Sequence, residues 1–291
     1  MIAYKEITDV APAIAILKKW ALHNRNITLL LHPNLSAIAA PCFIHRQENY
    51  LKKKCDVILA LGGDGTFLST ARLMNGTNVP VLGVNLGRIG FLTDVSLDSF
   101  TSVLNQLAQG EYTLSQRMML QVDVFEKKKK ILTDFALNEI VFRGKMGQEL
   151  IDLRVESNQK YLTNYWVDGL LISTPTGSTA YSLSAGGPII YPVSESILLT
   201  PINPKPLSIR PIIMPANHKI KIISENKKTK FVKMVIDGRQ ELRIHPALSI
   251  RITKSKISTH ILRPHGSSFL KSIRNKLGWS GFHGKKGSHV N

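Results

Sequence analysis

A glycine-rich turn lies between a strand pattern and a helix pattern, and this order limits the folds that are open to the chain. The apolar run Val57–Leu61 leads directly into Gly62–Thr66, whose sequence is Gly-Gly-Asp-Gly-Thr, and a helical pattern follows over Thr66–Met74. A buried strand, a tight turn and a helix form the repeating unit of α/β domains. Glycine also lets anionic oxygens approach backbone N–H groups, and a following helix N-terminus strengthens that attraction. The turn is therefore a candidate phosphate-binding loop inside an α/β domain, and the alternative is an ordinary tight turn, in which such glycines are common.

The residues on either side of this turn continue the alternation of strands and helices. Strand patterns occur at Ile27–Leu31, Val57–Leu61 and Val79–Val84, and helical patterns occur at Asp9–His23, Thr66–Met74 and Leu97–Gln109. Gly110 follows the last of these helices, in the position that commonly ends a helix. Because parallel strands need helical crossovers, we expect residues 1–115 to form a parallel sheet with helices on both faces.

The pattern changes near Arg117, where short strands replace helices. Strand patterns follow at Met119–Phe125, Ile131–Val141, Leu150–Glu156, Tyr165–Ser173, Ile209–Met214, His218–Ile223, Phe231–Ile236 and Leu248–Ile252. We interpret Lys127–Lys130 as the charged tip of a hairpin, and residues 116–262 as a β-rich domain. In residues 263–291, Phe269, Ile273 and Leu277 give one apolar face to a last helix that Gly278 ends, before a polar, basic tail.

Composition excludes several classes of protein. Apolar residues make up 43% of the 291 residues, which indicates a globular core. No apolar run reaches the ~18 residues of a membrane helix, and the N-terminus has no signal-peptide pattern. Two cysteines, Cys42 and Cys55, form neither a disulfide framework nor a zinc site, so a reducing cytoplasm is the simplest location.

The net charge is +18, and no acidic residue follows Glu241. Three interpretations remain open: a solvated basic surface, a field that attracts polyanionic small molecules, or a nucleic-acid-binding surface. No zinc spacing, basic zipper or aromatic-basic RNA motif accompanies the charge, so nucleic acid is the least favoured of the three.

Asp64 is the candidate for chemistry in the glycine turn. A carboxylate beside bound phosphate is unfavourable unless it holds Mg²⁺ or accepts a proton from an attacking hydroxyl. The alternative is that Asp64 only caps the helix that follows it. The turn is neither a Walker A loop nor the G-x-G-x-x-G dinucleotide fingerprint.

A second candidate lies in the Ser- and Thr-rich segment Asp168–Pro188. Its strand pattern ends at Ser173, a Thr-Pro-Thr-Gly turn follows, and Ser178–Ala185 is compatible with a short helix. The hydroxyl groups of this segment suit a nucleoside, and Ala180 leaves room for a flat ring. The alternative is a loop whose side chains satisfy their own backbone.

These motifs resemble those of one enzyme family. Gly62–Thr66 resembles the phosphate loop shared by NAD kinases, diacylglycerol kinases and 6-phosphofructokinases, and Asp168–Pro188 resembles the signature block of NAD kinases almost residue for residue. Further segments similar to this family are Leu137–Ile140, Gly83–Thr93, Leu207–Pro211 and Phe269–Trp279. The resemblance extends from about Asp56 to Trp279 and identifies the chain as a member of the NAD kinase family.

The resemblance implies a fold and a reaction. It implies an α/β domain over residues 1–115, a β-rich NAD-binding domain over 116–262, and a C-terminal helix in 263–291 that returns to the first domain, with the site between the domains. The reaction is phosphoryl transfer from ATP, with Mg²⁺, to the 2′-hydroxyl of the adenosine ribose of NAD. Homodimers or homotetramers, a cytoplasmic location, and no membrane or nucleic-acid partner are implied as well.

The site residues follow from the same resemblance. Asp64 is the expected catalytic residue, and Gly62, Gly63, Gly65 and Thr66 are the expected phosphate-binding residues. The expected NAD-binding residues are Asp64, Gly65, Asn138, Glu139, Trp166, Asp168, Thr179, Ala180, Tyr181, Ser182, Leu183 and Ser184.

Some positions depart from the family pattern, and two other functions stay open. The first strand is weak, Asn203–Pro206 replaces a stretch that commonly contains histidine, and Asp237-Gly-Arg-Gln240 leaves open whether Arg239 or Gln240 fills the family's glutamine position. The alternatives are a diacylglycerol-type lipid kinase, against which the polar run Thr179–Ser184 argues, and a non-catalytic nucleotide-binding protein that only the charge supports.

Overall fold

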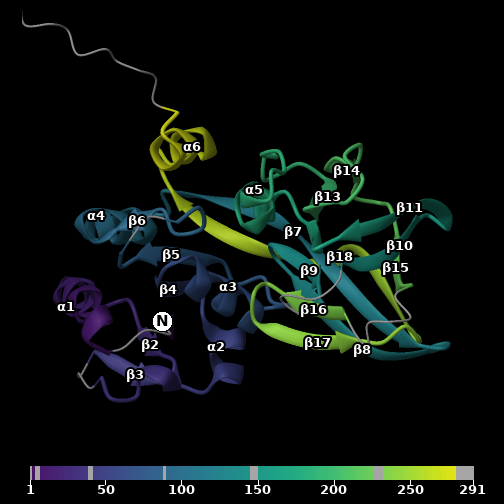
Figure 1. The fold of residues 1–291 in the computed structure, drawn as a ribbon. Helices are drawn as coiled ribbons and strands as arrows, with labels where there is room; N and C mark the ends of the chain where they lie inside the picture. The colour runs from purple at the N-terminus through teal and green to yellow at the C-terminus, as the bar shows by residue number, and fades with distance from the viewer. Residues whose placement is uncertain are drawn as a thin grey trace, which may run out of the picture. The chain divides into compact units, whose positions relative to one another are not determined.

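The structure is a computed structural model that describes residues 2–3, 7–38, 42–87, 90–144, 150–225 and 232–279. The chain forms two compact units. The first unit comprises Met1–Leu73, Val79–Ser115 and Ile261–Asn291, and the second comprises Met74–Asn78 and Gln116–His260. Figure 1 labels the helices and strands of both units.

A parallel sheet forms the centre of the first unit. Its strands are β1 (Ile2–Ala3), β4 (Ile58–Gly62), β5 (Val81–Asn85), β6 (Val95–Ser96) and the last residues of β18 (Leu248–Pro264). β4 pairs with β1 on one side and with β5 on the other, and Gly62 lies opposite Asn85. β5 also pairs with β6, and its Val81 with Ile261. The parallel sheet predicted for the N-terminal α/β domain is confirmed, and the end of β18 adds a strand from outside residues 1–115.

Helices cover this sheet. Leu59, Leu61, Leu82 and Val84 of β4 and β5 share one core with apolar residues of α1 (Ile7–His23) and α4 (Leu97–Ala108). Side chains alternate along a strand, so Ile58 and Ala60 point to the other face. The helix α3 (Asp64–Leu73) follows β4 and contacts both β4 and β5. Gly110 has φ of +77°, as expected for the residue that ends α4.

A smaller group of elements joins α1 to β4. It consists of β2 (Leu29–Leu31), η1 (Pro33–Leu35), β3 (Phe43–His45) and α2 (Glu48–Lys54). β2 and β3 pair in parallel as a separate two-stranded sheet. The sequence patterns did not predict β3 or α2, because each is too short to show a clear period.

The second unit contains two groups of antiparallel strands. One comprises β8 (Lys129–Ala136), β10 (Ile151–Ser157), β11 (Lys160–Val167), β15 (Ile220–Ser224) and the greater parts of β7 (Tyr112–Glu126) and β18. The other runs in the order β14 (Ile212–Pro215), β13 (Ser196–Ile202), β12 (Gly169–Ser173), β9 (Glu139–Arg143), β16 (Val232–Ile236) and β17 (Gln240–Ile244). Buried residues from both groups make one continuous core, which confirms the β-rich prediction.

Two predicted strands are wrong as single elements. Ile131–Val141 is divided between β8 and β9, which belong to different sheets, and the chain changes sheet at Leu137 and Asn138. Tyr165–Ser173 is likewise divided at Asp168 into the end of β11 and β12. An apolar run shows that residues are buried but not where the chain turns from one sheet to another. Both breaks fall at residues predicted to bind NAD.

The last helix, α6 (Phe269–Leu277), belongs to the first unit, as expected. Its N-terminus is capped by the Ser268 hydroxyl, which accepts a hydrogen bond from the N–H of Lys271, and it ends at Gly278 with φ of +68°. Asp94 binds the side chains of Arg263 and Lys276 at 2.7 and 3.4 Å, which ties α6 to the segment after β5. The tail after Trp279 lies outside the described residues. Within the described residues, no helix is long and apolar enough to cross a membrane.

Candidate functional site

The glycine turn occupies the carboxyl end of β4. β4 ends at Gly62 and α3 begins at Asp64, two residues earlier than predicted, so Asp64 and Gly65 lie in the first turn of the helix. A Cβ atom on Gly62 would overlap with the Thr66 side chain, so this glycine is required by packing. A Cβ atom on Gly63 or Gly65 would meet nothing within 4 Å. These two glycines therefore leave the outer side of the turn open.

The Asp64 carboxylate is held by a neighbouring segment. Its Oδ2 accepts the N–H of Phe91 at 2.7 Å, and its Oδ1 accepts the N–H of Leu92 at 3.0 Å and the hydroxyl of Thr93 at 3.1 Å. A Cβ atom on Gly90 would overlap with the same carboxylate. The glycine before Phe91 is thus explained by the close approach of Asp64 and not by a turn.

This arrangement leaves room for chemistry at Asp64. An ionised carboxylate has about four acceptor positions, and the neighbouring segment occupies three of them. One position remains for a hydroxyl proton or a cation. The hydrogen bonds also fix the rotamer of the side chain, which is what a group that orients a substrate requires. In the first unit, the structure therefore brings the predicted catalytic and phosphate-binding residues together in one turn.

The predicted NAD-binding residues Asn138 and Glu139 lie in the second unit, at the break between β8 and β9. Asp237 holds this break: its carboxylate accepts the N–H groups of Leu137, Asn138 and Glu139 at 2.8, 2.8 and 3.0 Å. The N–H of Asp237 in turn donates to the carbonyl of Glu139 at 3.0 Å. A break between strands would leave these backbone donors unsatisfied, and Asp237 satisfies them with an ionisable group.

The Thr-Pro-Thr-Gly turn of the signature block packs against the same break. The Thr174 hydroxyl donates to the Leu137 carbonyl at 2.6 Å, and the Thr174 N–H donates to the Asn138 carbonyl at 2.9 Å. A Cβ atom on Gly177 would overlap with the backbone of Asn138. The sequence motif around Asn138 and the block after Ser173 are therefore one structural assembly.

The rest of the block forms two short helical turns, η2 (Thr176–Thr179) and α5 (Tyr181–Ser184). Tyr181 is 47% exposed, Ser184 is exposed, and Thr179, Ala180 and Leu183 are half-buried. Ser182 is fully buried, and its hydroxyl shares a 2.8 Å hydrogen bond with that of Thr200. The hydroxyl of Ser182 thus holds the block in place, whereas Tyr181 presents its ring to solvent.

Trp166 and Asp168 lie at the end of β11, at the second strand break. Trp166 is 46% exposed, and the Lys205 ammonium lies 4.7 Å from the centre of its ring. Asp168 is exposed and accepts a hydrogen bond from the Asn203 amide at 2.9 Å. The segment Asn203–Pro206, which departs from the family pattern, therefore contacts both of these predicted residues.

The carboxyl group of Glu139 has the strongest electrostatic perturbation of the predicted site. Burial, with the Asp237 carboxylate adding to it, raises the pKa of Glu139 from an ordinary 4.5 to about 8. Glu139 as a whole is 7% exposed, and one of its carboxyl oxygens has no hydrogen-bond partner. The side-chain amide oxygen of Asn138 is also buried without a hydrogen-bond partner. Buried polar atoms normally have partners, so a ligand, an ion or water is expected to complete these hydrogen bonds.

We expect this carboxyl group to make folding stability depend on pH. The unfolded chain releases the Glu139 proton near pH 4.5 and the folded chain only near pH 8, so the folded chain binds more protons between these values. Stability therefore falls as pH rises through this window, by up to ~1.4 kcal/mol per pH unit. Glutamine does not titrate, so Glu139→Gln lacks this pH-dependent loss of stability. Its melting temperature should therefore fall less between pH 5.5 and 8.5 than that of the unchanged protein.

A matched control is Glu156→Gln, which removes a carboxylate paired with Arg154 at 3.1 Å in the same unit. Thermal unfolding of the three proteins across the pH range tests the assignment. If Glu139→Gln and the unchanged protein show parallel pH profiles, Glu139 does not titrate in this window.

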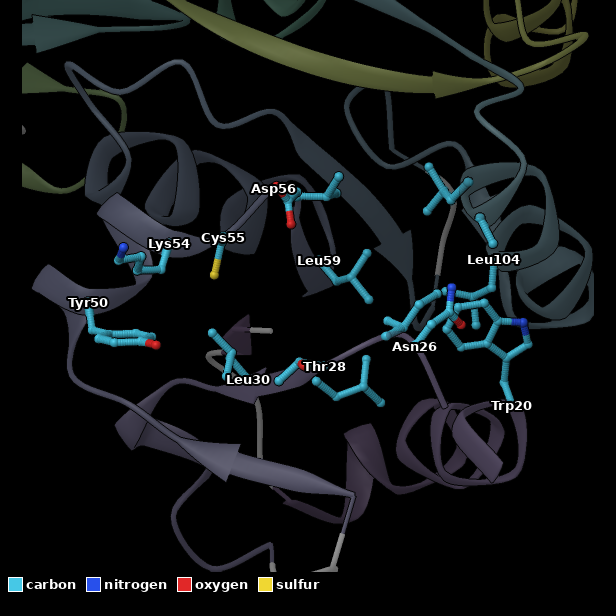
Figure 2. A pocket seen from close by; sticks show the side chains of 15 residues that line it. Trp20, Asn26, Thr28, Leu30, Tyr50, Lys54, Cys55, Asp56, Leu59 and Leu104 are labelled. Carbon is cyan, nitrogen blue, oxygen red and sulfur yellow. The ribbon is translucent and has the colours of Figure 1, made fainter. Parts of the chain in front are cut away.

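A cavity of about 540 Å³ lies elsewhere in the first unit. Its lining comes from α1, β2, α2, the start of β4 and α4, and Figure 2 shows Trp20 at one end and Tyr50 and Lys54 at the other. It reaches Asp56, Val57 and Leu59, at the opposite end of β4 from Gly62. None of the predicted site residues lines it.

Three residues that position the site were not predicted to do so. In the sequence, Asp237 stood out only as part of an Asp-Gly motif. Such a dipeptide commonly marks a turn, which was the one available signal for this position. Gly90 was noted only as part of a family segment. Arg117 is buried, and its guanidinium donates to the Thr176 hydroxyl at 3.3 Å, which places a cation beneath the signature block. A buried arginine gives no sequence signal, because its partners are distant along the chain.

Comparison with known proteins agrees with these motifs. Residues 34–112 match the ATP-NAD kinase N-terminal domain, and residues 137–263 match the ATP-NAD kinase C-terminal domain. An NAD kinase from Geotalea daltonii is 36% identical over 263 residues, which cover 90% of this chain and 92% of that one. An NAD kinase from Syntrophobacter fumaroxidans is 36% identical over 279 residues, which cover 96% and 97%.

Two solved structures are similar in fold. Yeast NADH kinase complexed with NADH has a TM-score of 0.86 and 25% identity, and the match covers 98% of this chain and 89% of that one. An NAD kinase from Archaeoglobus fulgidus in complex with ATP has a TM-score of 0.71 and 22% identity over 95% of each chain, and shows the fold alone. With both domains matched and relatives above one-third identity over nearly their whole length, the chain belongs to the NAD kinase family.

Proposed function

We propose that this protein is an NAD kinase that transfers a phosphoryl group from ATP to the 2′-hydroxyl of the adenosine ribose of NAD, which forms NADP. Membership of the family supports the reaction. The observation that carries the proposal is the Asp64 carboxylate, which three donors hold in place within a glycine turn whose outer side is open. A fixed acceptor beside an open backbone surface is what a phosphoryl transfer to a hydroxyl needs.

The first unit supplies the donor site and the base. Gly63 and Gly65 leave the turn accessible to phosphate oxygens, Gly62 lets the chain turn tightly against Thr66, and the α3 N-terminus favours the negative charge. Asp64 orients the ribose hydroxyl with its remaining acceptor position and accepts the proton of that hydroxyl as the oxygen attacks the phosphorus. Positioning and charge neutralisation supply most of the acceleration.

Mg²⁺ fits this site as an ion that ATP carries with it. Magnesium is commonly held by one or two carboxylates together with phosphate oxygens and water. Among the residues that the structure describes, no three His, Cys, Asp or Glu side chains gather as a metal cage. The acceptor position left on Asp64 is assigned to the ribose hydroxyl, so phosphate oxygens and water would hold the ion. When bound, the ion neutralises charge on the phosphate oxygens.

The second unit supplies the residues that bind NAD. Asn138 and Glu139 offer buried polar atoms without partners, and the strand break that carries them is fixed by Asp237. The exposed ring of Tyr181 and the half-buried Thr179, Ala180 and Leu183 form the edge of the same assembly, with Ser184 beside them. Trp166 and Asp168 add an aromatic surface and a carboxylate that suits ribose hydroxyls.

A single assay tests the function. Purified protein is mixed with ATP, Mg²⁺ and either NAD, NADH or a lipid extract, and NADP, NADPH and phosphorylated lipid are measured by chromatography. NADP or NADPH formation that depends on ATP supports the proposal, and their ratio gives the preferred acceptor. Phosphorylated lipid without NADP would support the diacylglycerol-type alternative, and nucleotide binding without any product would support a non-catalytic protein.

The state of the protein in the cell is also a proposal. We propose a homodimer or homotetramer in a reducing cytoplasm, as the family resemblance implies. The two cysteines, Cys42 and Cys55, are free thiols, which suits that location. Light scattering on the purified protein gives the number of subunits.

A further inference from the structure

A buried ion cluster connects the last helix to the segment that holds Asp64. Asp94 is the centre of this cluster: one carboxylate oxygen accepts from Arg263 at 2.7 Å, and the other accepts from Lys276 and from the Ser272 hydroxyl, both at 3.4 Å. Arg263 is 9% exposed and Lys276 is 10% exposed in their side chains. Buried ion pairs of this kind stabilise little by themselves, because desolvation of the charges offsets their attraction.

Lys276 does more than neutralise Asp94. Its ammonium lies 4.6 Å from the centre of the Phe91 ring, which is the distance of a cation–π contact. The N–H of Phe91 is the donor closest to the Asp64 carboxylate, at 2.7 Å. Lys276 thus contacts the first and the last residue of the stretch Phe91–Asp94. The three donors to Asp64 come from the first three residues of this stretch.

The charges in this region also act on one another. Burial lowers the pKa of Lys276, while the negative charges of Asp94 and Asp64 oppose that effect and favour the ammonium form. The neighbouring guanidinium of Arg263 acts in the same direction as burial. Lys276 therefore lies close enough to Asp64 for their charges to interact, although α6 and α3 are about 200 residues apart in the sequence.

We propose that Lys276 is a positioning residue for phosphoryl transfer, which acts by fixing the Phe91–Asp94 stretch that orients the Asp64 carboxylate. Arg263 secures the Asp94 end of this stretch from β18. Lys276 secures both the Asp94 end and the Phe91 ring. The C-terminal helix is thereby part of the catalytic apparatus of the first unit. This inference rests on the proposed function.

The test uses the full-length protein and four variants. Lys276→Met keeps the length of the side chain and removes its charge, and Lys276→Arg restores a cation that stacks on an aromatic ring. Lys276→Gln serves if Lys276→Met does not fold. Lys271→Met is the matched control, because Lys271 is an exposed lysine on the same helix and contributes only its backbone N–H to the cap.

We expect kcat for NADP formation to fall about 10- to 100-fold in Lys276→Met, with KM values for ATP and NAD changed far less, because a misplaced reacting group lowers turnover. Lys276→Arg should recover a large part of kcat, and Lys271→Met should match the unchanged protein. Unaltered kcat in a folded Lys276→Met or Lys276→Gln protein overturns the proposal, and so does an equal fall in Lys271→Met.

A second measurement does not depend on the reaction. The N–H groups of Phe91 and Leu92 are the donors to Asp64, so their hydrogen exchange reports on this link directly. We expect exchange in the peptide that contains them to be at least tenfold faster in Lys276→Met and unchanged in Lys271→Met. Unchanged exchange in Lys276→Met refutes the positioning role even if the protein proves not to phosphorylate NAD, whereas an inactive unchanged protein refutes only the proposed function.

Discussion

Asp64→Asn should lower kcat for NADP formation by at least ~10²-fold, the low end for loss of a general base. The amide cannot accept the ribose proton, and its nitrogen meets a backbone N–H of Phe91 or Leu92 where a carboxylate oxygen accepted one. Loss of that hydrogen bond should also lower the free energy of unfolding by roughly 1 kcal/mol. This loss is small enough for the protein to stay folded. Steady-state kinetics and thermal unfolding measure the two effects.

The matched control for this change is Asp56→Asn. Asp56 precedes β4, whereas Asp64 follows it, and Asp56 lines the cavity at the far end of the strand. Asp56→Asn should leave kcat close to that of the unchanged protein. Near-normal turnover in a folded Asp64→Asn protein would remove Asp64 from the catalytic role.

Gly90→Ala is expected to have a comparable effect on turnover, although the residue carries no functional group. The added methyl group would overlap with the Asp64 carboxylate, so either that side chain or the Gly90 backbone must move. Displacement of a reacting group by about 1 Å lowers rates on the order of 100-fold, and overpacking costs ~1–3 kcal/mol of stability. We therefore expect a large loss of kcat together with a lower melting temperature.

Gly87→Ala is the control for Gly90→Ala, because it lies in the same segment and a Cβ atom there would meet nothing within 4 Å. Its backbone hydrogen bond to the Asn85 side chain does not require glycine. Kinetics of the two variants side by side separate a general effect of alanine in this segment from displacement of Asp64. Equal activity of Gly90→Ala and Gly87→Ala would show that the carboxylate tolerates the methyl group.

The sequence predicted local elements well where their periods were long. α1, α4 and α6 follow apolar stripes of helical period, and the glycines after α4 and α6 have the positive φ angles that end a helix. It failed where a strand changes sheet, as at Leu137–Asn138 and at Asp168. Residues on both sides of such a break are equally buried, so the hydrophobic pattern does not show where the break lies.

The candidate site shows the same division. The residues of the glycine turn and of the Ser- and Thr-rich block are contiguous, so the sequence alone was enough to propose their chemistry. The roles of Gly90 and Asp237 and the proposed role of Lys276 could not be read in this way, because each contacts a partner 26 to 185 positions away. A glycine that accommodates a distant carboxylate has the same sequence signature as a glycine in any loop.

Periodicity and contiguous motifs were enough to predict the α/β first unit, the β-rich second unit and the family, and to propose the glycine turn as a phosphate site. The contacts that hold Asp64 and Asn138 in place are seen only in the folded chain. Those residues are fixed by hydrogen bonds from backbone N–H groups and by charges on elements far along the chain. Such contacts form only when the chain is folded, since every residue offers the same backbone groups and the fold alone selects which of them meet.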